Sequence, residues 1–177
     1  HQGVIALAAV REYASVEDIL SAARERGEAP LLVVCDEISD PHNLGAILRS
    51  AEAAGVHGVI IPKRNSVTLN YTVAKTSAGA IEYVPVVKVA NLPAAIDELK
   101  SRGAWIFGAD MDGTDYTALD YSGSIALVIG SEGKGIGRLV REKCDFIASL
   151  PMRGKINSLN ASVAAGILMF EAAKHRN

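Results

Sequence analysis

Residues 125–137 read IALVIGSEGKGIG and combine an apolar run with a glycine-rich stretch. The first five are a continuous apolar run, which is typical of a strand buried on both faces of a parallel sheet. Four glycines then follow within eight residues, at positions 130, 133, 135 and 137. Glycines after a strand allow positive φ angles and let a ligand approach the main chain closely. The stretch therefore predicts an α/β fold with a candidate binding loop, although a glycine-rich turn can also be only a turn.

The glycine spacing does not fit two common nucleotide-binding motifs. The run 133–137 (GKGIG) lacks the spacing of G-x-G-x-x-G and follows a late strand, whereas that fingerprint follows the first one. A P-loop is excluded as well, because no Ser or Thr follows Lys134 at the required distance from a glycine. Glu132 adds a carboxylate to the loop. A binding site of another kind therefore fits the sequence as well as a simple turn does.

Strand-like and helix-like segments alternate along the rest of the chain. Apolar patterns predict strands at 4–9, 31–36, 58–61, 82–87, 104–109, 125–129 and 146–150, and helices at 16–26, 44–54, 71–77, 92–101, 136–143 and 159–174. The acidic segment 110–124, with its Gly and Ser residues, is expected to be a surface loop. This alternation predicts an α/β domain with a mostly parallel sheet covered by helices on both faces.

Composition narrows the class of protein further. The 177 residues are 49% hydrophobic and 21% charged, which fits one globular domain and excludes disordered and disulfide-rich chains. A net charge of −2 gives no overall basic field. Cys35 and Cys144 belong to no ligand cluster, which predicts reduced thiols in a cytoplasmic protein without a metal site. No apolar run approaches the length of about 20 residues needed for a membrane span.

The segment 36–55 (DEISDPHNLGAILRSAEAAG) predicts a second candidate site. A strand ends at Asp36, and Asn43 is a suitable N-cap for the helix that follows. Arg49 lies about 160° from the centre of that helix's apolar stripe, counting about 100° per residue. A capping asparagine and a solvated arginine would explain both residues, but open α/β sheets also place ligands at such a strand end.

The third segment, 147–170 (IASLPMRGKINSLNASVAAGILMF), combines a basic loop with a long helix. Asn157 or Ser158 is expected to cap this helix, and capping also offers an ordinary role for Ser158 and Asn160. An apolar stripe at helical spacing is expected to face the core and consists of Leu159, Val163, Ile167 and Phe170.

Taken in order, three motifs resemble the signatures of the SpoU/TrmH family of RNA ribose 2′-O-methyltransferases, within the SPOUT superfamily. They are NLGAILRSAEAAG (43–55), LVIGSEGKGI (127–136) and LPMRGKINSLNASVAAGI (150–167). The segments IIPKRNSVTLN, VAKTSAGAIEYVPV and LKSRGAWIFGAD are similar to the branch that methylates a guanosine in 23S ribosomal RNA. The opening HQG resembles the point where that branch's amino-terminal RNA-binding domain joins the catalytic domain. Residues 1–177 are thus expected to be one catalytic domain, a leading strand and helix (1–30) before the motif-bearing core (31–177), with the RNA-binding domain missing upstream.

The resemblance implies a homodimer that binds S-adenosyl-L-methionine in a deep C-terminal trefoil knot. By alignment, the cofactor contacts are Gly130, Leu150 and Leu159, and the active-site set is Asn43, Arg49, Glu132, Ser158 and Asn160. Arg49 is expected to grip the phosphate beside the target ribose, because a guanidinium is a poor base. Glu132 is expected to orient Arg49 or another partner, which can lie across the dimer.

Charge suggests where RNA could bind. Six basic residues lie between Lys134 and Lys155 against two acidic ones, and Lys63, Arg64 and Lys75 form a second candidate patch. Transfer RNA is the main alternative to ribosomal RNA as the substrate. A Rossmann-type nucleotide-binding enzyme and a non-catalytic RNA-binding module are two competing interpretations of the same sequence.

Overall fold

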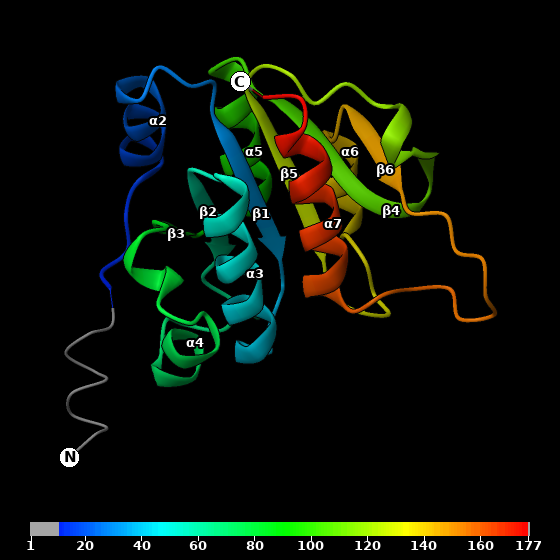
Figure 1. The fold of residues 1–177 in the computed structure, drawn as a ribbon, viewed down its shortest axis with the longest axis horizontal. Helices are drawn as coiled ribbons and strands as arrows, with labels where there is room; N and C mark the ends of the chain where they lie inside the picture. The colour runs from blue at the N-terminus through cyan, green and yellow to red at the C-terminus, as the bar shows by residue number, and fades with distance from the viewer. Residues whose placement is uncertain (1–10, 177) are drawn as a thin grey trace.

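Six parallel strands form the central sheet of the computed structural model, which describes residues 11–176 (Figure 1). The strands are β1 (Leu31–Asp36), β2 (Gly58–Pro62), β3 (Val86–Val89), β4 (Trp105–Asp115), β5 (Ile125–Gly130) and β6 (Phe146–Ser149). Their order is β3-β2-β1-β5-β4-β6, and every neighbouring pair is parallel. The predicted strand 4–9 lies outside the described residues.

Helices cover both faces of the sheet and confirm the predicted fold class. One face carries α2 (Val16–Glu25), α5 (Leu92–Ser101) and α6 (Arg138–Lys143), and the other carries α3 (Pro41–Ala54), α4 (Tyr71–Thr76) and α7 (Ala161–Ala173). Within β1, Leu31 and Val33 pack on the α3 side, while Leu32 and Val34 pack on the α2 side. All six residues of β1 are therefore buried, as a strand between two helical layers requires.

Two helix starts differ from the sequence prediction. Pro41 begins α3, and the N-cap is Asp40, whose Oδ1 accepts the main-chain N–H of His42 at 2.8 Å. Asn43 is therefore not the cap but lies in the first helical turn, where its side chain is free to bond elsewhere. Likewise α7 begins at Ala161 and not at residue 159, and Asn160 is its cap in place of Asn157 or Ser158.

Part of the predicted surface loop 110–124 is a strand. β4 continues to Asp115 and pairs with β6, with an irregularity in register between Ala109 and Thr114. Gly113 allows this close pairing, because a Cβ there would lie 2.3 Å from the carbonyl oxygen of Ile147. The 3-10 helix η2 (Tyr116–Ala118) follows directly. The predicted strand 82–87 is also wrong at its start, because the 3-10 helix η1 (Ala80–Glu82) occupies that position.

The stripe predicted to be the buried face of α7 is largely exposed. Val163 is 50% exposed and Phe170 is 49% exposed. The buried face is made instead of Ala161, Ala165, Leu168, Met169 and Ala172. Because α7 is apolar on every side, apolar periodicity could not distinguish its core face from its outer face.

The sheet contains a topological switch point between β1 and β5. Their carboxyl ends are adjacent, with Asp36 in register with Gly130. After β1 the chain continues to β2 on one side, whereas β5 is reached from β4 on the other side. Ligands in open α/β sheets bind outside the carboxyl ends of the strands at such a point. In the described part of the chain, no helix has the length and apolar character required to cross a bilayer.

Candidate functional site

A pocket opens at the carboxyl ends of β5 and β6 and beside the middle of β4, with a cavity of about 260 Å³. Its walls come from residues 109–111, the glycine-rich loop 129–135, Ala148, the loop 150–159 and the first turn of α7. The three residues assigned to the cofactor by resemblance all line it, namely Gly130, Leu150 and Leu159. The second and third motifs thus meet around one cavity.

The glycine-rich loop folds back over the end of β5. A Cβ at Gly130 would lie 2.2 Å from the carbonyl carbon of Gly135, so only glycine leaves room for the returning main chain. The N–H of Gly135 also donates to the carbonyl oxygen of Ser131 at 2.7 Å. Gly133 and Gly135 have φ values of 77° and 70°, which an L side chain rarely adopts. These glycines therefore shape the loop itself, and the loop presents main-chain groups to the pocket.

Asp36 anchors this loop from the neighbouring strand. Its Oδ2 accepts the main-chain N–H of Gly137 at 2.7 Å, and the residue is only 8% exposed. Burial raises the pKa of the Asp36 carboxyl above its ordinary value, while the hydrogen bond from Gly137 acts in the opposite direction. The next residue, Glu37, forms an exposed ion pair with Lys134 at 3.1 Å. Sequence reasoning missed Asp36, and the available signal was a carboxylate at the last position of a buried strand.

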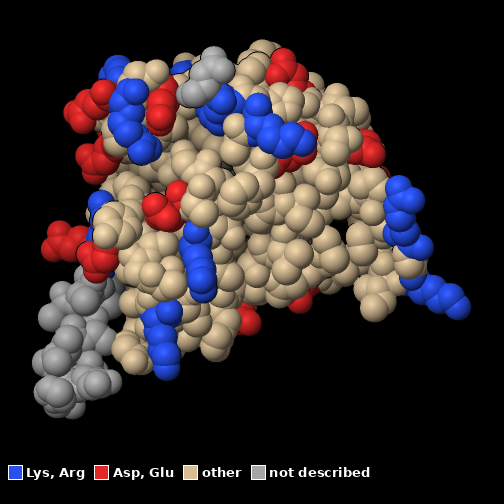
Figure 2. Space-filling view, viewed as in Figure 1, with Lys and Arg blue, Asp and Glu red and all other residues tan. Residues whose placement is uncertain are grey.

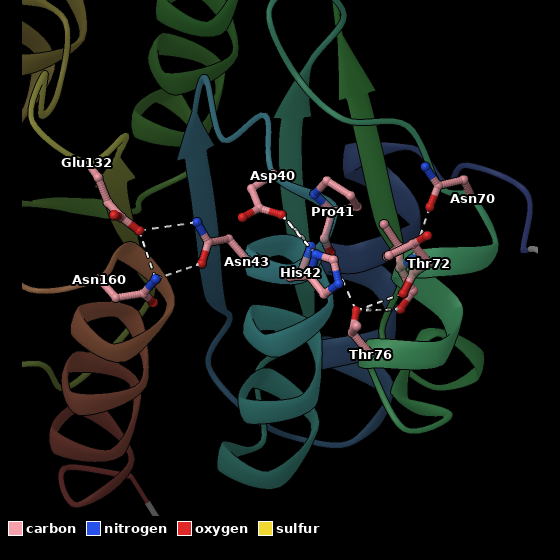
Figure 3. Close-up of polar contacts among 10 residues, drawn as sticks. Asp40, Pro41, His42, Asn43, Asn70, Thr72, Thr76, Glu132 and Asn160 are labelled. Atoms are coloured by element: carbon pink, nitrogen blue, oxygen red, sulfur yellow. Dashed lines mark hydrogen bonds and ion pairs between the residues drawn. The ribbon is translucent and has the colours of Figure 1, made fainter.

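Asn43, Glu132 and Asn160 meet in one hydrogen-bonded network (Figure 3). Oε1 of Glu132 accepts from Nδ2 of Asn160 at 2.8 Å and from Nδ2 of Asn43 at 3.3 Å. Asn160 Nδ2 also donates to Asn43 Oδ1 at 3.0 Å. The main-chain N–H of Ala161 donates to the same Glu132 oxygen at 3.3 Å, where the start of α7 favours a negative charge. The network therefore joins the three sequence motifs at one point.

The other two residues of the predicted active-site set form no hydrogen bond with this network. Ser158 lines the pocket from the loop 151–160, in which every residue is exposed. Arg49 is exposed on α3, six residues or about 9 Å along the helix axis from Asn43. Among residues 11–176 its side chain makes no hydrogen bond or ion pair. Within this chain, Glu132 is thus bonded to two asparagines and not to Arg49.

A second, shallow groove lies between α3 and α7. It is lined by Ala46, Ser50, Ser162, Val163, Gly166, Ile167 and Phe170. No cluster of three His, Cys, Asp or Glu side chains that could hold a metal ion occurs among residues 11–176.

Known proteins resemble this chain in both sequence and fold. Residues 30–170 match the model of the SpoU rRNA Methylase family. A Bacillus subtilis (strain 168) protein, YacO, which is assigned to the TrmH family of tRNA/rRNA methyltransferases, is 54% identical over 178 residues, covering 100% of this chain and 72% of that protein. This α/β domain is an RNA methyltransferase domain, and the chain belongs to the SpoU methylase family.

Solved structures agree with this assignment. The SpoU methyltransferase AviRb from Streptomyces viridochromogenes, solved also in complex with AdoMet, superposes with a TM-score of 0.78 at 31% identity, over 83% of this chain and 60% of that one. An AdoMet-bound rRNA methyltransferase from Sinorhizobium meliloti gives a TM-score of 0.83 at 28% identity, over 93% and 62%. The present chain thus spans less than two thirds of each of these two solved chains.

Proposed function

We propose that this chain transfers the methyl group of S-adenosyl-L-methionine to a ribose 2′-hydroxyl of RNA, with a guanosine in 23S ribosomal RNA as the target and transfer RNA as the alternative. The observation that carries the proposal is the pocket formed by the second and third motifs beside the Asn43–Glu132–Asn160 network. The RNA methyltransferases that resemble the chain, two of them solved with AdoMet, support it. An RNA methyltransferase of this kind would act in the cytoplasm.

The residues of the pocket fit the proposed cofactor. Leu150 and Leu159 offer apolar surface for an adenine ring, while the loop 130–135 offers main-chain donors and acceptors for its polar edges. Asp110 also lines the pocket, but its carboxylate is already ion-paired with Arg141 and accepts the main-chain N–H of Met111. Gly130, Leu150 and Leu159 would hold the cofactor, which supplies a methyl group on a sulfonium when it is bound.

The polar residues divide into a group that bonds to itself and a group that is available to the substrate. Asn43, Glu132 and Asn160 use their side chains on one another, so their role is to hold the three motifs in register around the pocket. Arg49 is uncommitted and exposed, which suits a guanidinium that grips the phosphate flanking the target ribose. Ser158 would contact that ribose from the loop. The ribose hydroxyl would give its proton to the phosphate or to water as the oxygen–methyl bond forms and the sulfur–methyl bond breaks.

The active form is proposed to be a homodimer. The outer face of α7 exposes large apolar side chains, and the groove between α3 and α7 continues this surface. A second copy seated there would cover Phe170 and lie next to Ser50, the immediate neighbour of Arg49. This arrangement would let Arg49 of one copy serve the site of the other.

Two further features extend the proposal beyond the described contacts. The segment 150–160 leaves β6 at the sheet edge and returns to α7 beside α3, and we propose that it threads the trefoil knot of the superfamily. Residues 1–177 would be the catalytic domain, preceded in the whole protein by an RNA-binding domain. The YacO relative, of which this chain covers 72%, leaves room for such a domain.

The test combines binding and turnover. Calorimetry with S-adenosylmethionine and, separately, with NAD distinguishes the proposed cofactor from a dinucleotide, and only the former should bind. Incubation with labelled S-adenosylmethionine and a 23S ribosomal RNA transcript, followed by mapping, should place the label on a ribose. Binding of RNA without any label transfer would instead indicate a non-catalytic RNA-binding module. Arg49→Ala should lower turnover more than tenfold and leave cofactor affinity unchanged, and a smaller loss would remove Arg49 from the mechanism.

A further inference from the structure

Ion pairs neutralise much of the positive charge of the basic patch predicted between Lys134 and Lys155. Four of its six cations lie against carboxylates, in the pairs Lys134–Glu37 (3.1 Å), Arg138–Glu142 (4.0 Å), Arg141–Asp110 and Lys143–Asp97 (2.9 Å). A paired cation has less charge left for a phosphate and would lose its partner on binding one. This part of the surface is therefore a weaker attractor of RNA than its sequence indicates.

Five cations without an ion-pair partner among residues 11–176 come from two segments that contain no Asp or Glu. Residues 53–81 carry Lys63, Arg64 and Lys75, and residues 146–170 carry Arg153 and Lys155. All five are exposed, and none forms an ion pair with any part of the chain that the structure describes. Because these segments hold no carboxylate of their own, their positive charge remains available to a polyanion.

In both segments, the loops that follow the strands lie at the carboxyl ends of the strands, where the pocket opens. The loop after β2 packs on the loop after β1, since the N–H of Val67 donates to the carbonyl oxygen of Ile38 at 3.2 Å. The end of α4 touches the start of α3, with Thr76 Oγ1 donating to the carbonyl oxygen of Pro41 at 3.4 Å (Figure 3). Figure 2 shows basic side chains over α3 and α4 and along the projecting loop, with a largely uncharged surface between them.

An aromatic side chain accompanies the cations on the α4 side. Tyr71 is 45% exposed and lies one helical turn before Lys75, so the two side chains share a face of α4. Exposed aromatic rings beside cations are typical of surfaces that stack the bases of single-stranded RNA and hold its phosphates.

We propose that single-stranded RNA docks on Lys63, Arg64, Lys75 and Tyr71 at one side of the pocket and on the loop carrying Arg153 and Lys155 at the other. This inference rests on the proposed function and locates the substrate path for it. The surface around α6, which bears Arg138 and Lys143, takes no part in docking.

The test neutralises the unpaired cations and measures how salt affects binding. In the triple variant Lys63→Gln, Arg64→Gln and Lys75→Gln, affinity for a 23S ribosomal RNA transcript should fall at least tenfold at low salt. Each lost phosphate contact on a single strand lowers the slope of log K against log salt by about 0.7. The slope should therefore become shallower by about 2.

A matched control removes the same charge from paired positions, with Arg24→Gln, Arg138→Gln and Lys143→Gln. These cations lie against Glu17, Glu142 and Asp97, so the salt slope should match that of the parent chain. A Tyr71→Ala variant should weaken binding without changing the slope, because stacking releases no counterions.

Calorimetry with S-adenosylmethionine should give the parent affinity in all three variants. The docking surface is overturned if the parent methylates RNA but the test triple binds like the parent, or if the control triple weakens binding as much as the test triple. If the parent chain neither binds nor methylates RNA, the proposed function itself is wrong, and the proposed docking surface is rejected as well.

Discussion

Replacing Gly130 by alanine should damage the pocket by a predictable amount. The new Cβ would lie 2.2 Å from the Gly135 carbonyl carbon, whereas ordinary contacts begin at 3.4 Å. Because the obstacle is main chain and not the tip of a flexible side chain, the loop must shift by more than 1 Å or the strand must strain. Overpacking of this kind costs about 1–3 kcal/mol.

That cost must appear in one of two measurements. If the loop stays closed, the free energy of unfolding in urea should fall by about 1–3 kcal/mol. If the loop opens to relieve the clash, the cofactor must close it again in order to bind. The same energy then lowers cofactor affinity by about 5- to 150-fold. Urea unfolding and calorimetric titration with S-adenosylmethionine together measure both losses.

Gly154→Ala is the matched control. It also adds one methyl group to a loop around the pocket, but no atom lies within 4 Å of the new Cβ and no positive φ is involved. Its stability and its affinity should stay within about 0.5 kcal/mol of the parent, as for most surface substitutions. The reasoning about the folded-back loop is refuted if Gly130→Ala matches Gly154→Ala in both measurements.

Three other predictions follow from single contacts. Asp36→Ala leaves the N–H of Gly137 without its acceptor, so steady-state kinetics should show a KM for S-adenosylmethionine raised about tenfold or more with little change in kcat, and Asp36→Asn should restore it. Burial lowers the pKa of His57 below its ordinary value of 6.5. The unfolded chain therefore takes up a proton first as pH falls, and the free energy of unfolding should decline below pH 6.5 more steeply in the parent than in His57→Gln, as urea titrations would show. Phe170→Asp should leave the fold intact because the side chain is 49% exposed, while sedimentation should show loss of the proposed dimer.

Local patterns predicted elements correctly where one physical signal dominates. β1 was predicted to the residue at both ends because a fully apolar run stops at a charged pair, and the bounds of α5 are likewise those expected. The start of α5 is marked twice, by Asn91 as the cap and by a proline in its first turn. Family resemblance placed Asn43, Glu132 and Asn160 in a set of five active-site residues, but it did not predict the hydrogen bonds that join these three.

Other features depend on partners that are distant in the sequence. The cap of α3 is an exception, because its signal is local: Asp40 precedes a proline in the first turn, as Asn91 does in α5, and the interpretation of Asn43 as the cap overlooked it. The extension of β4 depends on pairing with β6. Without that pairing, the acidic and glycine residues at the end of β4 favour a loop. The buried face of α7 was mistaken because three of its five buried residues are alanines, while the larger Val163 and Phe170 are about half exposed. Asp36 was missed because its partner is a main-chain N–H 101 positions away.

The bond between Asn43 and Asn160 spans 117 positions of the chain. A ribosome that adds about 5–20 residues per second needs roughly 6–23 seconds to make the second asparagine after the first. During that interval α3 is already synthesised, but Asn160 and the first turn of α7, which complete the network and the pocket wall, do not yet exist. A nascent polypeptide halted before α7 should therefore take up no methyl donor, and translation itself would set the moment at which activity begins.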